Sequence, residues 1–125
     1  GPERAGWAYR GRSLLYAGIV LPGSSDRPVV EGAPLLGIHD LVNRRTASGV
    51  PLGPEEAISG LEALVAYTLG SAHASHQEQE RGSLAVGKVA DLAVLDADPA
   101  TCEAEAIGSI GVRSTWIGGR EGWSA

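Results

Sequence analysis

The stretch GSLAVGKVADLAVL, residues 82–95, does more to decide the fold than any other part of the chain. Its glycines predict two tight turns around a short extended piece. The residues that follow, rich in Ala, Val and Leu, predict a β-strand at 90–96. A second strand is predicted at 112–117, and Gly118-Gly119 predict a turn after it. The last third of the chain is therefore expected to consist of short strands and a β-hairpin.

The part of the chain before this stretch has the periodicity of helices. Apolar residues at steps of three and four predict one helix that opens at Pro34 and ends at Gly49, and another over 61–72. Ser59 and Glu62 have the spacing of a capping box at the start of the second helix. A shorter helix is expected at 13–17, with Ser13 as its cap.

A β-branched run, Ile-Val-Leu at 19–21, stops at a loop of Pro, Gly, Ser and Asp. This pattern is typical of a buried parallel strand in an α/β protein, where loops after strands carry the chemistry. Asp26 in that loop has two interpretations. It could hold a metal or act as a base, or it could organise the loop by accepting hydrogen bonds from backbone N–H groups. The spacing by itself favours the second interpretation.

Composition and charge exclude several classes of protein. Apolar residues make up 43% and charged residues 20%, which argues against wholesale disorder. A formal charge of -5 argues against a nucleic-acid partner, and the apolar runs are far shorter than the ~20 residues of a membrane span. The only cysteine, Cys102, excludes an internal disulfide and fits a reducing compartment. We therefore expect a soluble, cytoplasmic protein.

Four segments together resemble enzymes of the amidohydrolase superfamily. Residues 82–95 are similar to the family's GSL-x-x-GK-x-ADL-x-VL run, 62–68 to its EAL-x-x-YT helix, and 112–119 to its closing V-x-x-T-x-x-GG hairpin. Residues 23–29 resemble GSD-x-PV at the end of its eighth barrel strand, although Pro22 and the second serine before Asp26 depart from the pattern. The segments occur in family order. They are most similar to the branch of YtcJ-like metal-dependent hydrolases and N-substituted formamide deformylases.

The resemblance implies an α/β chain that is one part of a larger fold. Residues 1–80 would hold the last strand and helices of a (β/α)8 barrel, and residues 81–125 the C-terminal strands of a small β-sandwich. A complete barrel needs about 250 residues, so the resemblance implies a fragment of a longer enzyme. The family's H-x-H pair, its carboxylated lysine and its two further histidine ligands have no counterparts here. The histidines present, His39, His73 and His76, do not end predicted strands.

The resemblance also implies a function. Asp26 would be both a metal ligand and the catalytic carrier of a proton, with Zn or another divalent metal bound in the complete enzyme. That enzyme would hydrolyse a non-peptide carbon–nitrogen bond in a small amide-type substrate, and this chain by itself would be inactive. The alternative is a non-catalytic structural or oligomerisation module. Exposed barrel edges predict a homo-oligomer.

The remaining candidate residues favour structural interpretations. His73 and His76 share a helical face, but a structural zinc site wants four ligands, so a solvated helix end is favoured. Cys102 has no adjacent basic residue and is not expected to be a nucleophile. The other groups are interpreted as a surface histidine (His39), a solvated helix end in preference to an anion site (Arg44-Arg45), a helix start (Glu55-Glu56) and a carboxylate bonded to a neighbouring loop (Asp91).

Overall fold

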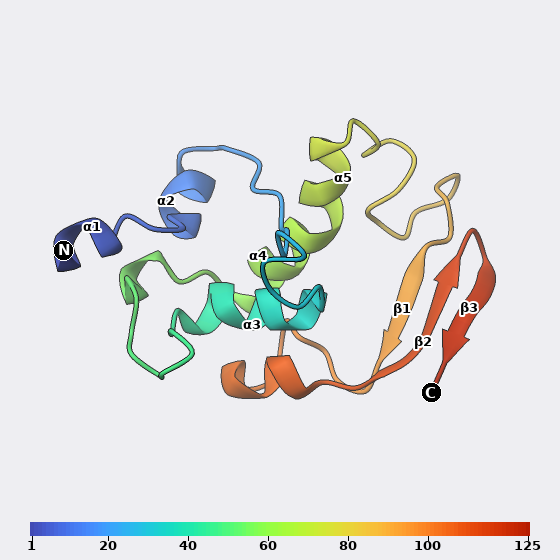
Figure 1. Ribbon diagram of the computed structural model, residues 1–125. Helices are drawn as coiled ribbons and strands as arrows, with labels where there is room; N and C mark the ends of the chain where they lie inside the picture. The colour runs from blue at the N-terminus through green and yellow to red at the C-terminus, as the bar shows by residue number, and fades with distance from the viewer.

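The structure is a computed structural model that describes the backbone of residues 1–125 and all side chains except those of residues 2 and 3. Helices form one part of the molecule and an antiparallel sheet the other, with the C-terminus on the sheet (Figure 1).

None of the helices in the described chain combines the length and the apolar character that a membrane crossing requires. The elements are α1 (Pro2–Ala5), α2 (Gly11–Tyr16), α3 (Pro34–Asn43), η1 (Pro54–Glu56), α4 (Gly60–Val65), η2 (Ala66–Gly70), α5 (Ser71–Ala74), β1 (Leu92–Leu95), η3 (Ala104–Ser109), β2 (Val112–Ile117) and β3 (Arg120–Ser124).

The sheet has the order β1-β2-β3, and both strand pairs are antiparallel. Leu92 of β1 lies opposite Trp116 of β2, and Ile117 lies opposite Arg120 of β3. Both glycines between β2 and β3 have positive φ, +57° and +77°, as a two-residue hairpin turn with the right twist requires. The strands predicted at 90–96 and 112–117 and the hairpin are confirmed, although the first strand is limited to Leu92–Leu95.

Helix α3 supplies one side of the hydrophobic core. It opens at Pro34 as predicted, and Ile38, only 2% exposed, packs with Ile58, Ala63 and Ile107. The prediction that this helix runs to Gly49 is wrong. It ends at Asn43, because Arg44 turns into the left-handed region with φ +50° and its side chain is buried.

The second predicted helix is continuous from residue 60 to residue 74, although its central turn is π-helical. Its capping box is confirmed: the Ser59 hydroxyl accepts the Glu62 N–H, and the Glu62 carboxylate accepts the Ser59 N–H. The bond that the Glu62 carboxylate accepts from the Ser59 N–H, followed by the one from the Ser59 hydroxyl, holds the pKa of Glu62 below its ordinary value.

The predicted strand at 19–21 is not a strand in this structure. Ile19 and Val20 are about half exposed, and the described chain offers no neighbouring strand to pair with them. A strand needs a partner for its backbone N–H and C=O groups. Here the segment leads instead onto helix η2, where the Gly23 N–H donates to the Ala66 carbonyl at 2.8 Å.

The short helix near residue 13 also differs from expectation. It begins at Gly11 and ends at Tyr16, so Ser13 lies inside its first turn and is not its cap. Gly18, with φ +78°, follows the helix end as the sequence predicts. The reason for the earlier start is a contact with Glu56, 43 residues away, that local sequence does not show.

Candidate functional site

Asp26 lies at the tip of the loop that follows Leu21. Its φ is +53°, in the left-handed region that Asp tolerates better than most residues. The Asp26 N–H donates to the Ser24 hydroxyl at 3.2 Å, and the Asp26 carbonyl accepts the Val29 N–H at 2.9 Å. The backbone of Asp26 therefore organises the loop, while its side chain is exposed.

Tyr67 of η2 holds this loop against the helices. Its hydroxyl donates to the Ser24 carbonyl at 3.1 Å. Its ring occupies space that two glycines leave open, because a Cβ on Gly23 would lie 2.3 Å from the ring and one on Gly37 only 1.7 Å from the hydroxyl. Burial raises the pKa of Tyr67, and the negative charge of Asp40 adds to that rise. The phenol therefore remains a hydrogen-bond donor over the neutral range.

The π-helical turn supplies the other anchors of the loop. The Ala66 carbonyl accepts the Ser71 N–H five residues on and also the N–H of Gly23. The Ser71 hydroxyl donates to the Gly23 carbonyl at 2.8 Å. Turns of this kind are frequent at functional sites, because they expose helical carbonyls to partners outside the helix. In this chain the hydrogen bonds from η2 and Ser71 to Gly23 replace the strand pairing that the segment before Asp26 lacks.

Asp26 opens onto a cavity of about 520 Å³ between its own loop, α2, α3 and the segment after α3. The cavity has a mainly apolar wall with charged groups of both signs. A second carboxylate, that of Asp40, lies on the same wall. The charged and aromatic lining residues are Tyr9, Arg10, Asp26, Asp40, Arg44, Arg45 and Tyr67, and the apolar ones include Leu14, Leu21, Val29, Val30, Leu41 and Leu52.

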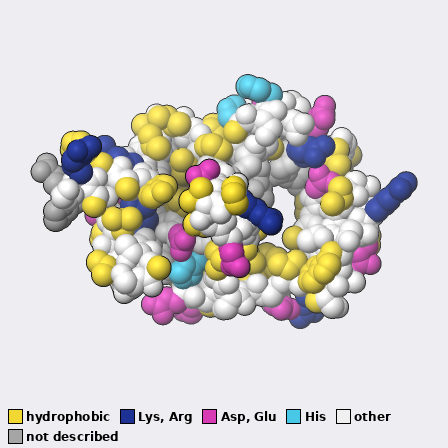
Figure 2. Space-filling view, in the orientation of Figure 1, with side chains coloured by type: hydrophobic (Ala, Val, Ile, Leu, Met, Phe, Trp, Pro, Cys, Tyr) yellow, Lys and Arg dark blue, Asp and Glu magenta, His cyan; other side chains and the backbone are white. Residues whose placement is uncertain are grey.

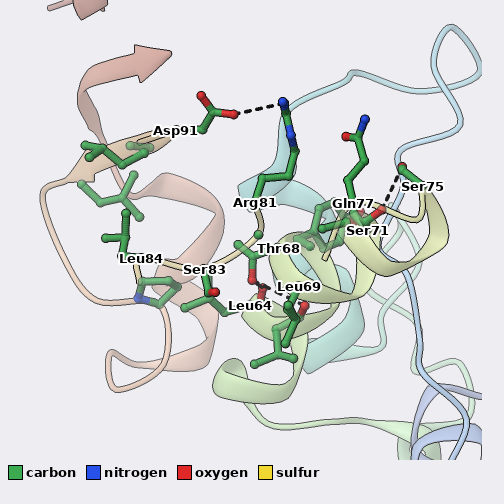
Figure 3. A pocket seen from close by; sticks show the side chains of 18 residues that line it. Leu64, Thr68, Leu69, Ser71, Ser75, Gln77, Arg81, Ser83, Leu84 and Asp91 are labelled. Carbon is green, nitrogen blue, oxygen red and sulfur yellow. Dashed lines mark hydrogen bonds and ion pairs between the residues drawn. The ribbon is translucent and has the colours of Figure 1, made fainter. Parts of the chain in front are cut away.

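A larger cavity, of about 780 Å³, lies between the α4–α5 helix, the loop after it and β1 (Figure 3). Its ionic groups are already paired: Arg81 donates to the Asp91 carboxylate at 3.2 Å, and the other oxygen of Asp91 accepts the Gly118 N–H at 2.8 Å. The interpretation of Asp91 as a structural residue bonded to a neighbouring loop is confirmed. Although this cavity is the larger, its carboxylate is fully used, so Asp26 marks the better candidate site.

None of the three histidines lines the cavity onto which Asp26 opens. The His73 ring is 3.7 Å from the Glu78 carboxylate and half exposed, while His76 is exposed. The His39 ring is 3.0 Å from the Asp40 carboxylate and only 29% exposed, because it packs against Gly108. Among the side chains that the structure describes, no group of three or more His, Cys, Asp and Glu is placed to hold a metal ion.

Two charged residues have roles that the sequence did not indicate. Arg44, interpreted as part of a solvated helix end, is 5% exposed and donates to backbone carbonyls. Glu56 lies in the first turn of η1, so its interpretation as a helix-start residue is confirmed, but it is also only 6% exposed and accepts the N–H and the hydroxyl of Ser13. Both roles have one physical cause: partners distant in sequence satisfy the charges, and periodicity carries no sign of them.

We expect Tyr67→Phe to loosen the Asp26 loop without unfolding the chain. The change removes the bond to the Ser24 carbonyl and keeps the ring between the two glycines. One such bond contributes about 1 kcal/mol to the free energy of unfolding. Urea denaturation should show a loss of that size, and a loss below about 0.3 kcal/mol would contradict the anchoring role.

Comparison with known proteins places this chain in a family. The model of the amidohydrolase family matches residues 1–121. This chain belongs to the amidohydrolase family.

Relatives of known name agree with this assignment. The chain is 40% identical over 108 residues to an N-substituted formamide deformylase of Arthrobacter pascens, covering 86% of this chain and 20% of that protein. It is 32% identical over 123 residues to YtcJ of Bacillus subtilis, named as an amidohydrolase, covering 96% of this chain and 23% of YtcJ. It is 34% identical over 123 residues to the protein LONG AFTER FAR-RED 3 of Arabidopsis thaliana, covering 97% and 21%. The chain therefore spans about a fifth of the length of these relatives. No solved structure shows a significant match.

Proposed function

We propose that this chain is the C-terminal part of a longer hydrolase, called the parent below, that cleaves non-peptide carbon–nitrogen bonds of amide type. The family assignment and the names of two relatives support the reaction class. The observation that carries the proposal is an exposed carboxylate, Asp26, on a loop anchored by Tyr67 and Ser71 at the mouth of a cavity. A catalytic group needs a fixed position from which its side chain can reach the substrate.

The chemistry assigned to Asp26 is the transfer of one proton. As the oxygen of a water molecule bonds to the amide carbonyl carbon, the Asp26 carboxylate accepts a proton from that water. Asp26 then gives the proton to the leaving nitrogen as the carbon–nitrogen bond breaks, which yields an acid and an amine. One carboxylate thus acts as general base and then as general acid.

The described residues do not make a metal site by themselves, because Asp26 is not part of any group of three or more ligand side chains. Tight zinc sites need three or four preplaced ligands. Zn or another divalent metal is therefore proposed for the parent alone, with its remaining ligands outside this chain. The division into a barrel part, residues 1–80, and a sandwich part, residues 81–125, is a proposal of the same kind, as are a small-molecule substrate and a cytoplasmic location.

We expect the 125-residue chain by itself to bind no stoichiometric zinc and to hydrolyse no amide. A lone carboxylate binds zinc too weakly to survive dialysis. Metal analysis after dialysis and an assay with N-formyl and N-acyl amines provide the check. Retention of one zinc per chain together with turnover would show that the site is complete without the rest of the parent.

A non-catalytic module that associates with copies of itself is the second candidate, favoured by apolar side chains on the surface. Trp7, Tyr16 and Val29 are each more than 60% exposed, and hydrophobic side chains are visible over the helical part of the molecule (Figure 2). Large exposed apolar patches mark interfaces.

We expect the isolated chain to form a dimer or a higher oligomer at micromolar concentration, through these side chains and through the half-exposed Ile19 and Val20. Light scattering coupled to gel filtration measures the mass. A single peak at 12.8 kDa would contradict the expectation. The same measurement on the parent serves as the control, because there these apolar side chains are expected to be covered.

A further inference from the structure

Two charged side chains are buried in the described part of the chain, Arg44 and Glu56, and both bind the same segment, residues 8–13. Burying a charge is costly unless hydrogen bonds satisfy it. Among the described residues, Arg44 and Glu56 do not form an ion pair with each other. Glu56 accepts hydrogen bonds from Ser13, and Arg44 donates to the carbonyls of residues 8, 9 and 53.

Glu56 caps helix α2 from a distance. The residue before the helix, Arg10, makes no side-chain cap, and the orphan N–H of Ser13 in the first turn donates to a Glu56 carboxylate oxygen at 2.8 Å. The Ser13 hydroxyl donates to the other oxygen, and the Arg10 guanidinium lies 3.5 Å from it. The bond from the Ser13 hydroxyl, followed by that from the Ser13 N–H, lowers the pKa of Glu56, so the carboxylate is charged at neutral pH.

Arg44 holds the residues just before that helix. Its guanidinium donates to the carbonyls of Ala8 at 2.8 Å and Tyr9 at 3.1 Å, and also to that of Gly53 at 3.2 Å. The segment is thus fixed at its carbonyls by a buried cation and at its helix start by a buried anion. Both partners come from the stretch 44–56, which follows α3.

The segment so fixed is a wall of the cavity onto which Asp26 opens. Tyr9, Arg10, Gly11 and Leu14 all line that cavity. We propose that Glu56 is a positioning residue for the Asp26 site: by capping α2 it sets the place of the wall that contacts the substrate. This inference rests on the proposed function, since it deepens the account of the same site.

The test compares Glu56→Gln with Glu62→Gln. Both replace a carboxylate that accepts an N–H and a hydroxyl at a helix start, but Glu56 caps α2, which lines the cavity, whereas Glu62 caps α4, which does not. In the 125-residue chain, amide hydrogen exchange at residues 11–16 should quicken about tenfold in the Glu56 variant, the size of a typical cap. In the Glu62 variant exchange at residues 11–16 should stay unchanged, because both bonds of Glu62 go to one oxygen and the glutamine amide oxygen can still accept them.

In the parent, the Glu56 variant should raise KM for an N-formyl amine about tenfold and leave kcat within about twofold, because α2 supplies wall contacts and no reacting group. The Glu62 variant should leave both within about twofold. Equal kinetics for the two variants, or unchanged exchange at residues 11–16, would overturn the proposal.

If Glu56→Gln does not fold, Ser13→Ala removes one of its two Ser13 bonds and should change exchange and KM in the same direction by a smaller factor. Unchanged values in that variant would count against the proposal. A wild-type parent that hydrolyses no amide would contradict the proposed function instead. The comparison of hydrogen exchange would then decide by itself whether Glu56 caps α2.

Discussion

Asp26→Asn in the parent is expected to lower kcat by ~10²–10⁴-fold, the usual contribution of general acid–base catalysis. Asparagine keeps the size of the side chain, and the bonds that shape the loop at this position are made by the backbone of Asp26. The fold of the loop should therefore persist, while the amide cannot accept the proton of the attacking water. Steady-state kinetics and a melting curve on the same preparation measure both effects.

The control for this change is Asp98→Asn. Asp98 also organises a loop, through the bond that its carboxylate accepts from the Ala100 N–H at 2.8 Å, but it does not line the Asp26 cavity. Its replacement should leave kcat unchanged and change stability by less than about 1 kcal/mol, because the asparagine amide oxygen still accepts the Ala100 N–H. If Asp26→Asn instead lowers the melting temperature and keeps more than about a tenth of the turnover, Asp26 is a loop anchor only.

Gly70→Ala is expected to destabilise the chain, although Ala normally favours a helix interior over Gly by about 0.5–1 kcal/mol. A Cβ at Gly70 would lie 2.3 Å from the carbonyl oxygen of Leu21, a backbone atom that cannot swing aside. Such overpacking costs about 1–3 kcal/mol. The segment from Leu21 to Asp26 would have to move away from η2, so both stability and the parent's turnover should fall.

Gly11→Ala is the matched control, because the new Cβ would meet its nearest neighbours at an ordinary 3.7 Å. Thermal unfolding should show a loss of ~4–12 °C for the Gly70 variant and little change for the Gly11 variant. A melting temperature raised by Gly70→Ala would show that helix propensity dominates and that Leu21 does not pack tightly on η2.

The elements that the sequence predicts correctly are those with local causes. Ser59 and Glu62 form the capping box because the two partners are three residues apart. The hairpin at Gly118-Gly119 needs positive φ at adjacent positions, which glycine supplies at no steric cost. Pro34 opens α3 for a similar reason, since its fixed φ and missing N–H suit a first turn.

The errors have distant causes. The run at 19–21 has the composition of a strand, but pairing depends on a neighbour, and here helix η2 binds the segment that follows it. Helix α3 ends six residues before the glycine expected to end it (residue 43 against residue 49), because buried Arg44 binds carbonyls of residues 8, 9 and 53.

For the site, the sequence singled out Asp26 and its loop but not the groups that hold them. Tyr67 was visible only as part of a family motif, and its contacts with Gly23 and Gly37 require the folded arrangement. Glu56 had the signature of a helix start, and its contact with Ser13 spans 43 residues. Contacts between residues so far apart in sequence form through tertiary packing, and local residue types and spacing do not reveal them.

The most direct measurement for the account is anomalous diffraction from crystals of the parent, grown with zinc and shown to be active. The account predicts a metal peak ~2.0–2.2 Å from an Asp26 carboxylate oxygen, the distance of a zinc–carboxylate bond. An active, zinc-loaded parent whose metal lies elsewhere, with the Asp26 carboxylate bonded only to its own loop, would contradict the central claim.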